Sequence, residues 1–127
     1  MLKQENLSYQ QIIEKHDQNI QSIYDKIIDY GWNSPDNNWA GHHFKTIDGF
    51  EIKTNTIQGH NCPEGESVSI YKNGVKIYDF TYMLQSELFQ DVLKPLIAFT
   101  KERTGCNHDH ATAVAEYIYG TEMLAQG

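Results

Sequence analysis

The sequence has little arginine, little cysteine and no long apolar run, and each shortage excludes a class of protein. Arg103 is the only arginine among 127 residues, and the formal net charge is −7. Proteins that bind nucleic acids need a basic stripe for phosphates and arginine for base edges, so direct binding of DNA or RNA is not expected. The apolar runs extend over only a few residues, which is too short to span a membrane.

Signal and catalytic motifs are missing as well. The N-terminus has no apolar signal core followed by a small-residue cleavage site, so we expect a cytoplasmic protein whose two cysteines stay reduced. The sequence contains no nucleophile elbow, phosphate loop, glycine-rich dinucleotide turn or His-Glu-x-x-His motif. The chain length and an apolar content of 39% predict one globular domain over residues 1–127.

Three stretches carry apolar side chains at helical spacing, and they predict helices over residues 9–30, 87–104 and 110–124. Each is preceded by a residue that can cap a helix, namely Ser8, Ser86 and Asp109. Gly31 and Gly105 follow the first two stretches as natural helix stops. Pro95 lies inside the second stretch, where we expect either a kink or a late helix start at Lys94.

Two hairpins are predicted between the first and second helices. Residues 43–47 and 50–57 flank Asp48-Gly49, and residues 67–72 and 75–82 flank Asn73-Gly74; both dipeptides favour two-residue turns. The order is therefore one helix, four strands and two helices. It predicts a two-layer α+β fold in which helices cover a four-stranded antiparallel meander.

A two-residue turn at Asn73-Gly74 also predicts the register of the second hairpin. Lys72 would then pair with Val75, Ile70 with Ile77, and Val68 with Asp79. Alternation places one aliphatic set on the first face of the sheet: Val68, Ile70, Val75 and Ile77. The opposite face would carry Ser67, Ser69, Tyr71, Tyr78 and Phe80.

Histidine and cysteine are concentrated in two short windows. The first holds His42, His43, His60 and Cys62, and the second holds Cys106, His108 and His110. Thiolate and imidazole are the ligands that zinc prefers, so His60, Cys62, Cys106, His108 and His110 are candidate zinc ligands. The spacing differs from that of zinc fingers, and histidine is common in polar loops, so a protein without any cofactor is the alternative.

A loop rich in tryptophan and asparagine is the second candidate site. Its rigid aromatic rings and amides are typical of recognition surfaces, and the candidate binding residues are Trp32, Asn37, Asn38, Trp39, His42 and His43. A small ligand could also stack on an indole there. The competing interpretation is that both indoles close the core of a small domain.

These observations favour a small acidic binding protein that inhibits or sequesters a partner with a basic surface. Immunity proteins for bacterial toxins and phage anti-defence proteins are likewise short, acidic and free of catalytic motifs. This likeness is an analogy, and function has to be argued from a site. Two alternatives stay open. One is a metal-dependent enzyme that uses the His/Cys windows, and the other is a protein that sequesters a nucleotide-like small molecule.

Overall fold

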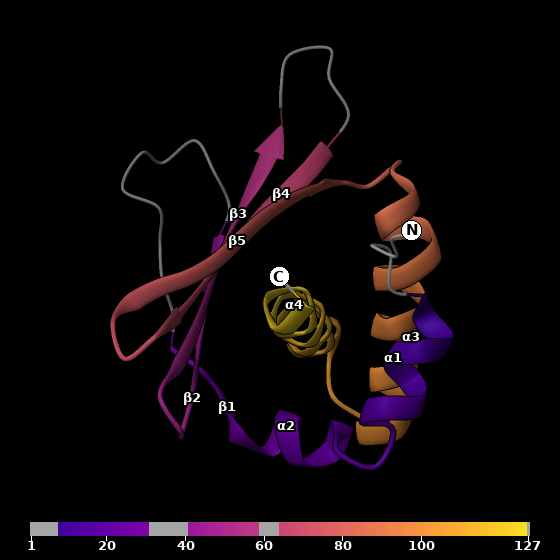
Figure 1. Ribbon diagram of the computed structural model, residues 1–127, viewed down its shortest axis with the longest axis horizontal. Helices are drawn as coiled ribbons and strands as arrows, with labels where there is room; N and C mark the ends of the chain where they lie inside the picture. The colour runs from indigo at the N-terminus through magenta and orange to yellow at the C-terminus, as the bar shows by residue number, and fades with distance from the viewer. Residues whose placement is uncertain (1–7, 31–40, 59–63, 127) are drawn as a thin grey trace.

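A curved antiparallel sheet wraps around one long helix in the computed structural model of the chain (Figure 1). The structure describes residues 8–30, 41–58 and 64–126. The strands are β1 (Ile27–Asp29), β2 (Gly41–Thr46), β3 (Phe50–Gln58), β4 (Glu64–Lys72) and β5 (Val75–Met83). The helices are α1 (Tyr9–His16), α2 (Ile20–Lys26), the π-helical segment η1 (Leu88–Leu93), α3 (Lys94–Thr104) and α4 (His108–Gln126).

The sheet is a five-stranded meander in which strands adjacent along the chain pair in the order β1 to β5. The predicted α+β class is confirmed, but the count of four strands is wrong because β1 adds an edge strand beside β2. Among the described helices, none combines the length and the apolar character needed to cross a membrane.

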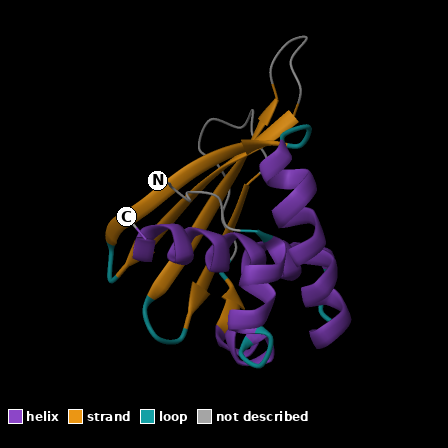
Figure 2. Ribbon diagram, turned by 45° about the vertical axis from the view of Figure 1, so that its right-hand side comes forward, coloured by secondary structure: helices purple, strands orange, loops and turns teal. Residues whose placement is uncertain are grey.

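Helix α4 occupies the centre of the molecule. Figure 1 views it almost end-on, with the sheet curving around one side and α1 and α3 on the other. Its middle is buried nearly all round, through Ala111, Ala113, Val114, Ala115, Glu116 and Ile118. A helix that is apolar on every side belongs inside a core, and its alanines allow close packing. The arrangement therefore differs from the predicted two layers, because α4 lies between the sheet and the remaining helices (Figure 2).

The first predicted helix is broken. Helix α1 ends at His16, α2 begins after Asn19, and residues 27–29 form β1 instead of a final helical turn. The Asp17 carboxylate, directly after α1, lies 2.7 Å from the Arg103 guanidinium. Ile27 and Ile28 are β-branched, and they pair with residues of β2. Helical spacing alone could not reveal this edge pairing, because a strand partner is a tertiary contact.

The two hairpin turns differ. Asn73 and Gly74 have φ values of 53° and 87°, as a type I′ turn requires, and Lys72 pairs with Val75 as predicted. The loop at Asp48 is longer than the expected two residues, because β2 ends at Thr46 and β3 begins at Phe50. The Thr46 hydroxyl donates to Asp48 (2.6 Å) and accepts from the Phe50 amide (2.9 Å), which stabilises this three-residue loop.

A β-bulge overturns the predicted face assignment of β5. Tyr71 pairs with Lys76 but Ile70 pairs with Tyr78, so Ile77 has no partner on β4. One extra residue reverses the faces beyond it. Tyr78 and Phe80 therefore share a face with Ile70 and Val68, whereas Asp79 lies opposite Ser69 in solvent and pairs with Lys76 at 3.1 Å.

The C-terminal helices keep most of their predicted signals. The Ser86 hydroxyl accepts from the Phe89 amide, and Gly105 ends α3 at a φ of 74°. Helix α3 begins at Lys94 with Pro95 in its first turn, directly after the π-helical segment, so the late start expected as the alternative to a kink is confirmed. Asp109 is not the cap of α4, because Asn107 accepts from the His110 amide (2.8 Å) and the helix begins two residues earlier than predicted, at His108.

Candidate functional site

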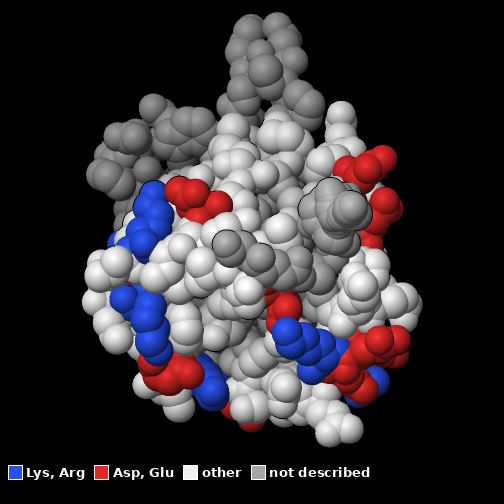
Figure 3. All heavy atoms as spheres, viewed as in Figure 1, with Lys and Arg blue, Asp and Glu red and all other residues white. Residues whose placement is uncertain are grey.

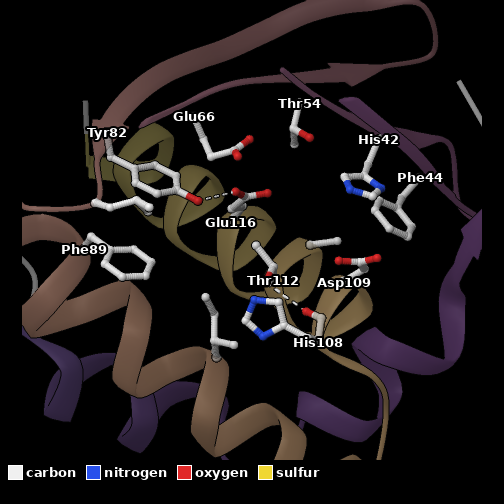
Figure 4. A pocket seen from close by; sticks show the side chains of 13 residues that line it. His42, Phe44, Thr54, Glu66, Tyr82, Phe89, His108, Asp109, Thr112 and Glu116 are labelled. Atoms are coloured by element: carbon white, nitrogen blue, oxygen red, sulfur yellow. Dashed lines mark hydrogen bonds between the residues drawn. The ribbon is translucent and has the colours of Figure 1, made fainter. Parts of the chain in front are cut away.

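A cavity of about 310 Å³ lies between the sheet and the N-terminal half of α4 (Figure 4). The strand face that points toward α4, here called the inner face, supplies one wall, and α4, η1 and α3 supply the others. Cross-strand pairing orders the inner face in rows. His42 pairs with Thr54 in one row, and in the next row Glu66 lies between Thr56 and Tyr82.

Apolar side chains, several of them aromatic, form much of the cavity wall. These side chains are Phe44, Tyr82, Leu84, Phe89 and Ile97. The rings of Tyr82 and Phe89 stack with centroids 5.7 Å apart and an interplanar angle of 5°. Such a wall favours a ligand with a flat or apolar body.

A buried carboxyl forms the floor of the cavity beside Tyr82. Glu116 is 1% exposed, and its Oε2 accepts a hydrogen bond of 2.7 Å from the hydroxyl of Tyr82 (Figure 4). The pKa of Glu116 is raised from 4.5 to about 8, mainly by burial; the hydrogen bond from Tyr82 lowers it and the charge of Glu66 raises it. Burial likewise raises the pKa of Tyr82 far above its ordinary value, so the phenol remains a donor.

A second carboxyl faces the first across the cavity. Glu66 and Glu116 point toward one another in Figure 4. The Oε2 of Glu66 accepts from the Thr56 hydroxyl at 3.0 Å. Burial raises the pKa of Glu66, and the Thr56 bond and the charge of His42 lower it in part. Like charges in a shared low-dielectric space resist ionising together, so this pair retains a proton near neutral pH.

The first turns of α4 supply the solvent-exposed part of the cavity wall. His108 and Asp109 are both exposed side chains that also line it, and Thr112 lies one turn further along. The Thr112 hydroxyl donates to the His108 carbonyl at 2.8 Å. No lysine or arginine is among the described residues of the cavity wall, whereas three acidic side chains are.

The structure separates the predicted binding residues that it describes. His42 points from β2 to the inner face, where its ring stacks on Phe44 and lines the cavity. His43 takes the opposite face, because successive strand residues alternate, and it is buried with its Nε2 2.9 Å from Glu51. The other predicted binding residues, Trp32, Asn37, Asn38 and Trp39, lie outside the described residues.

The predicted zinc ligands of the second window do not converge. His110 packs edge-on against Phe44 and places its Nδ1 2.8 Å from Asn107, His108 lines the cavity, and Cys106 is a half-buried free thiol. Within residues 8–30, 41–58 and 64–126, His, Cys, Asp and Glu side chains form no group of three that could hold a metal ion. His60 and Cys62 lie outside these ranges, so the four-ligand zinc site stays a prediction.

Sequence reasoning missed the residues that define the cavity, namely Glu66, Tyr82 and Glu116. One local signal was present for Glu116, a lone acid between Ala-Val-Ala and Tyr-Ile-Tyr in a helix with small apolar residues. An ionisable side chain in such a stretch is buried more often than its type suggests, and it then needs a partner. Its partner, Tyr82, is 34 positions away and could not be identified from spacing.

Comparisons with protein-family models, with curated proteins and with solved structures gave no match.

Proposed function

We propose that the protein binds a small, partly apolar molecule in the cavity between the inner face of the sheet and α4. The observation that carries this proposal is the Glu116–Tyr82 pair at the floor of a cavity of about 310 Å³. A buried carboxyl raises the free energy of the fold unless its oxygens are satisfied, and Tyr82 reaches only Oε2 of Glu116, so the other oxygen suits a ligand donor. Mostly apolar walls with a few convergent polar groups are typical of ligand sites.

Phosphate-bearing ligands are disfavoured by the same wall. Nucleotide sites supply cations or backbone amides for the phosphates, whereas the described wall carries Glu66, Asp109 and Glu116 without lysine or arginine. The sequence left a nucleotide-like ligand open as an alternative, and this wall favours a ligand without phosphate, such as a base-like ring or an amine.

The proposal can be tested by an NMR titration with three small aromatic probes, benzyl alcohol, benzylamine and benzoate. We expect at least one probe to shift the amide resonances of the cavity wall, with the largest changes at Phe89, Thr112 and Glu116. The variant Thr112→Phe fills the cavity and should abolish these shifts. Ala98→Phe adds the same side chain at an exposed position of α3 outside the cavity and should leave binding intact.

Absence of binding by all three probes, or equal binding to Thr112→Phe and wild type, would contradict the proposal. Mass spectrometry of small molecules released from the heated protein first establishes that the cavity is empty before the titration; a molecule retained by wild type and lost in Thr112→Phe would itself support the proposal.

The sequence-based hypothesis of a partner inhibitor stays a second proposal. It rests on the net charge of −7 and on the loop that contains Trp32 and Trp39, which the structure does not describe. Acidic and basic side chains are interspersed on the face seen in Figure 3, and neither sign covers it. If a basic partner is found, its association should slow as salt rises, because screening weakens electrostatic steering. Trp39→Ala should weaken that binding while leaving Tm nearly unchanged.

A further inference from the structure

We infer that the ligand of this cavity carries a protonated amine, whose ammonium group takes the place of a proton held by the Glu66–Glu116 pair. This inference rests on the proposed function and specifies its ligand class. On binding, one proton leaves the carboxyl pair for the solvent, and the ammonium supplies the compensating charge.

A second carboxyl of α4 shows what a cationic partner does to a poorly exposed glutamate of this fold. Helix α4 carries a second poorly exposed carboxyl, Glu122, whose oxygens lie 3.0 Å from Lys15 Nζ and 2.7 Å from His16 Nε2. Burial is the largest single influence on Glu122 and raises its pKa, but the hydrogen bonds and charges of His16 and Lys15 together bring it below the ordinary value. Glu116 has only the neutral phenol of Tyr82 as its described partner, and its carboxyl is protonated below a pKa of about 8.

Neighbouring lysines do not reach the cavity. Lys45 lies 3.6 Å from the ring centroid of Tyr30, and Lys53 lies 5.0 Å from that of Tyr71, both on the outer face of the sheet. The described wall thus has three acidic side chains and no lysine or arginine to match them, and the charge of His42 acts on Glu66. Glu116 has no such cationic partner among the described residues, and a cationic ligand would supply one.

The hydrogen-bond geometry leaves acceptors available for an ammonium group. Tyr82 occupies Oε2 of Glu116 and Thr56 occupies Oε2 of Glu66. Among the described residues, neither Oε1 atom has a hydrogen-bond donor, and the two carboxyls face each other across the cavity (Figure 4). Two such oxygens suit the several N–H donors of an ammonium, and the stacked rings of Tyr82 and Phe89 suit its apolar body and attract its charge.

The titratable groups that line the cavity with Glu116 determine how the affinity for an amine depends on pH. They are Glu66 on β4, Tyr82 on β5, His42 on β2, and His108 and Asp109 on α4 itself. The residues that η1 and α3 contribute to the wall are the apolar Phe89 and Ile97. Ammonium binding favours the ionised carboxyls, so affinity for an amine should rise between about pH 6 and pH 8, as the proton that must leave becomes easier to remove.

The three benzyl probes separate this inference from the proposed function, because they differ in charge but little in shape. We expect benzylamine to bind at least about ten-fold more tightly than benzyl alcohol near pH 8, and benzoate to bind worst. Calorimetry in two buffers of different ionisation enthalpy should show proton release with benzylamine and none with benzyl alcohol.

Carboxamide variants provide the matched control. Glu116→Gln and Glu66→Gln should each remove most of the preference for benzylamine and most of the proton release, while benzyl alcohol still binds. Glu102→Gln removes an exposed carboxyl of α3 and should change neither quantity. If Glu116→Gln fails to fold, Glu66→Gln alone decides.

Equal affinity for benzylamine and benzyl alcohol, preference for benzoate, or benzylamine binding without proton release would overturn the inference and leave the proposed function standing. Failure of all three probes to bind would overturn both.

Discussion

At the scale of single residues, two carboxyls of one helix show how surroundings decide charge. Glu122 lies beside Lys15 and His16, and its pKa is below the ordinary value despite burial. Glu116 lies six positions earlier, fully inside the fold, and burial raises its pKa to about 8. The two side chains are chemically identical, so the difference arises entirely from the groups that the fold places around them.

The raised pKa of Glu116 predicts a pH-dependent stability. The native state binds this proton more tightly than the unfolded chain, whose carboxyl has the ordinary pKa of 4.5. The stabilising contribution is therefore complete below about pH 4.5 and is lost as the pH rises through about 8. The free energy of unfolding of wild type relative to Glu116→Gln should fall over this window, by at most about 1.4 kcal/mol per pH unit.

Urea denaturation at a series of pH values measures this difference. Glu102→Gln serves as the control, because it removes an exposed carboxyl and should follow the wild-type profile. A constant difference between wild type and Glu116→Gln from pH 5 to pH 8 would show that Glu116 titrates normally.

At the scale of elements, local turn chemistry fixes the hairpins while close packing fixes α4. Asn73 and Gly74 form their turn from their own backbone preferences. The position of α4 depends instead on residues distant in sequence. A Cβ at Gly120 would clash with Ile70 Cδ1 of β4, so the missing side chain sets how closely helix and sheet approach.

Gly74→Val tests the turn. The φ of 87° strains any residue with a Cβ, although no atom lies within 4 Å of that position, so the cost is conformational and not steric. We expect a loss of roughly 1 kcal/mol or more in the free energy of unfolding. Asn73→Gly, which keeps the required positive φ, should lose less. An equal loss in both variants would argue against a type I′ turn as the cause.

Gly120→Ala tests the contact between α4 and the sheet. Alanine has the better helix propensity, so a surface site would gain about 1 kcal/mol, but overpacking against Ile70 should instead cost roughly 1–3 kcal/mol. Ile70→Val removes the clashing Cδ1 atom. The double variant should therefore be more stable than the sum of the two single effects, as measured by a double-mutant cycle. Strict additivity would mean that the two residues do not compete for the same space.

At the scale of the whole molecule, the sheet curves around α4 and leaves a cavity where the inner face meets the first half of that helix. Within each of the two windows the described histidines are close together in the sequence, but the fold places their side chains in different surroundings. His42 and His108 reach the cavity, whereas His43 and His110 pack elsewhere. Proximity along the chain is therefore a poor guide to the site.

Removal of metal is the whole-molecule test of the zinc hypothesis. A zinc ion held by His60, Cys62, Cys106 and His108 or His110 would stabilise the native state, so chelation should lower Tm. Elemental analysis should find stoichiometric zinc in the untreated protein. A protein free of zinc, with the same Tm in chelator, would eliminate the site.

The sequence by itself determined the features that depend on residues a few positions apart. These include the α+β class, the Asn73-Gly74 turn, the Ser8 and Ser86 caps and the Gly105 stop, because their hydrogen bonds and φ values are local. Only the tertiary structure decided the break in the first helix, the edge strand β1 and the bulge that reverses β5. It alone brought Glu66, Tyr82 and Glu116 together, since strand pairing and the packing of α4 join segments that no local periodicity relates.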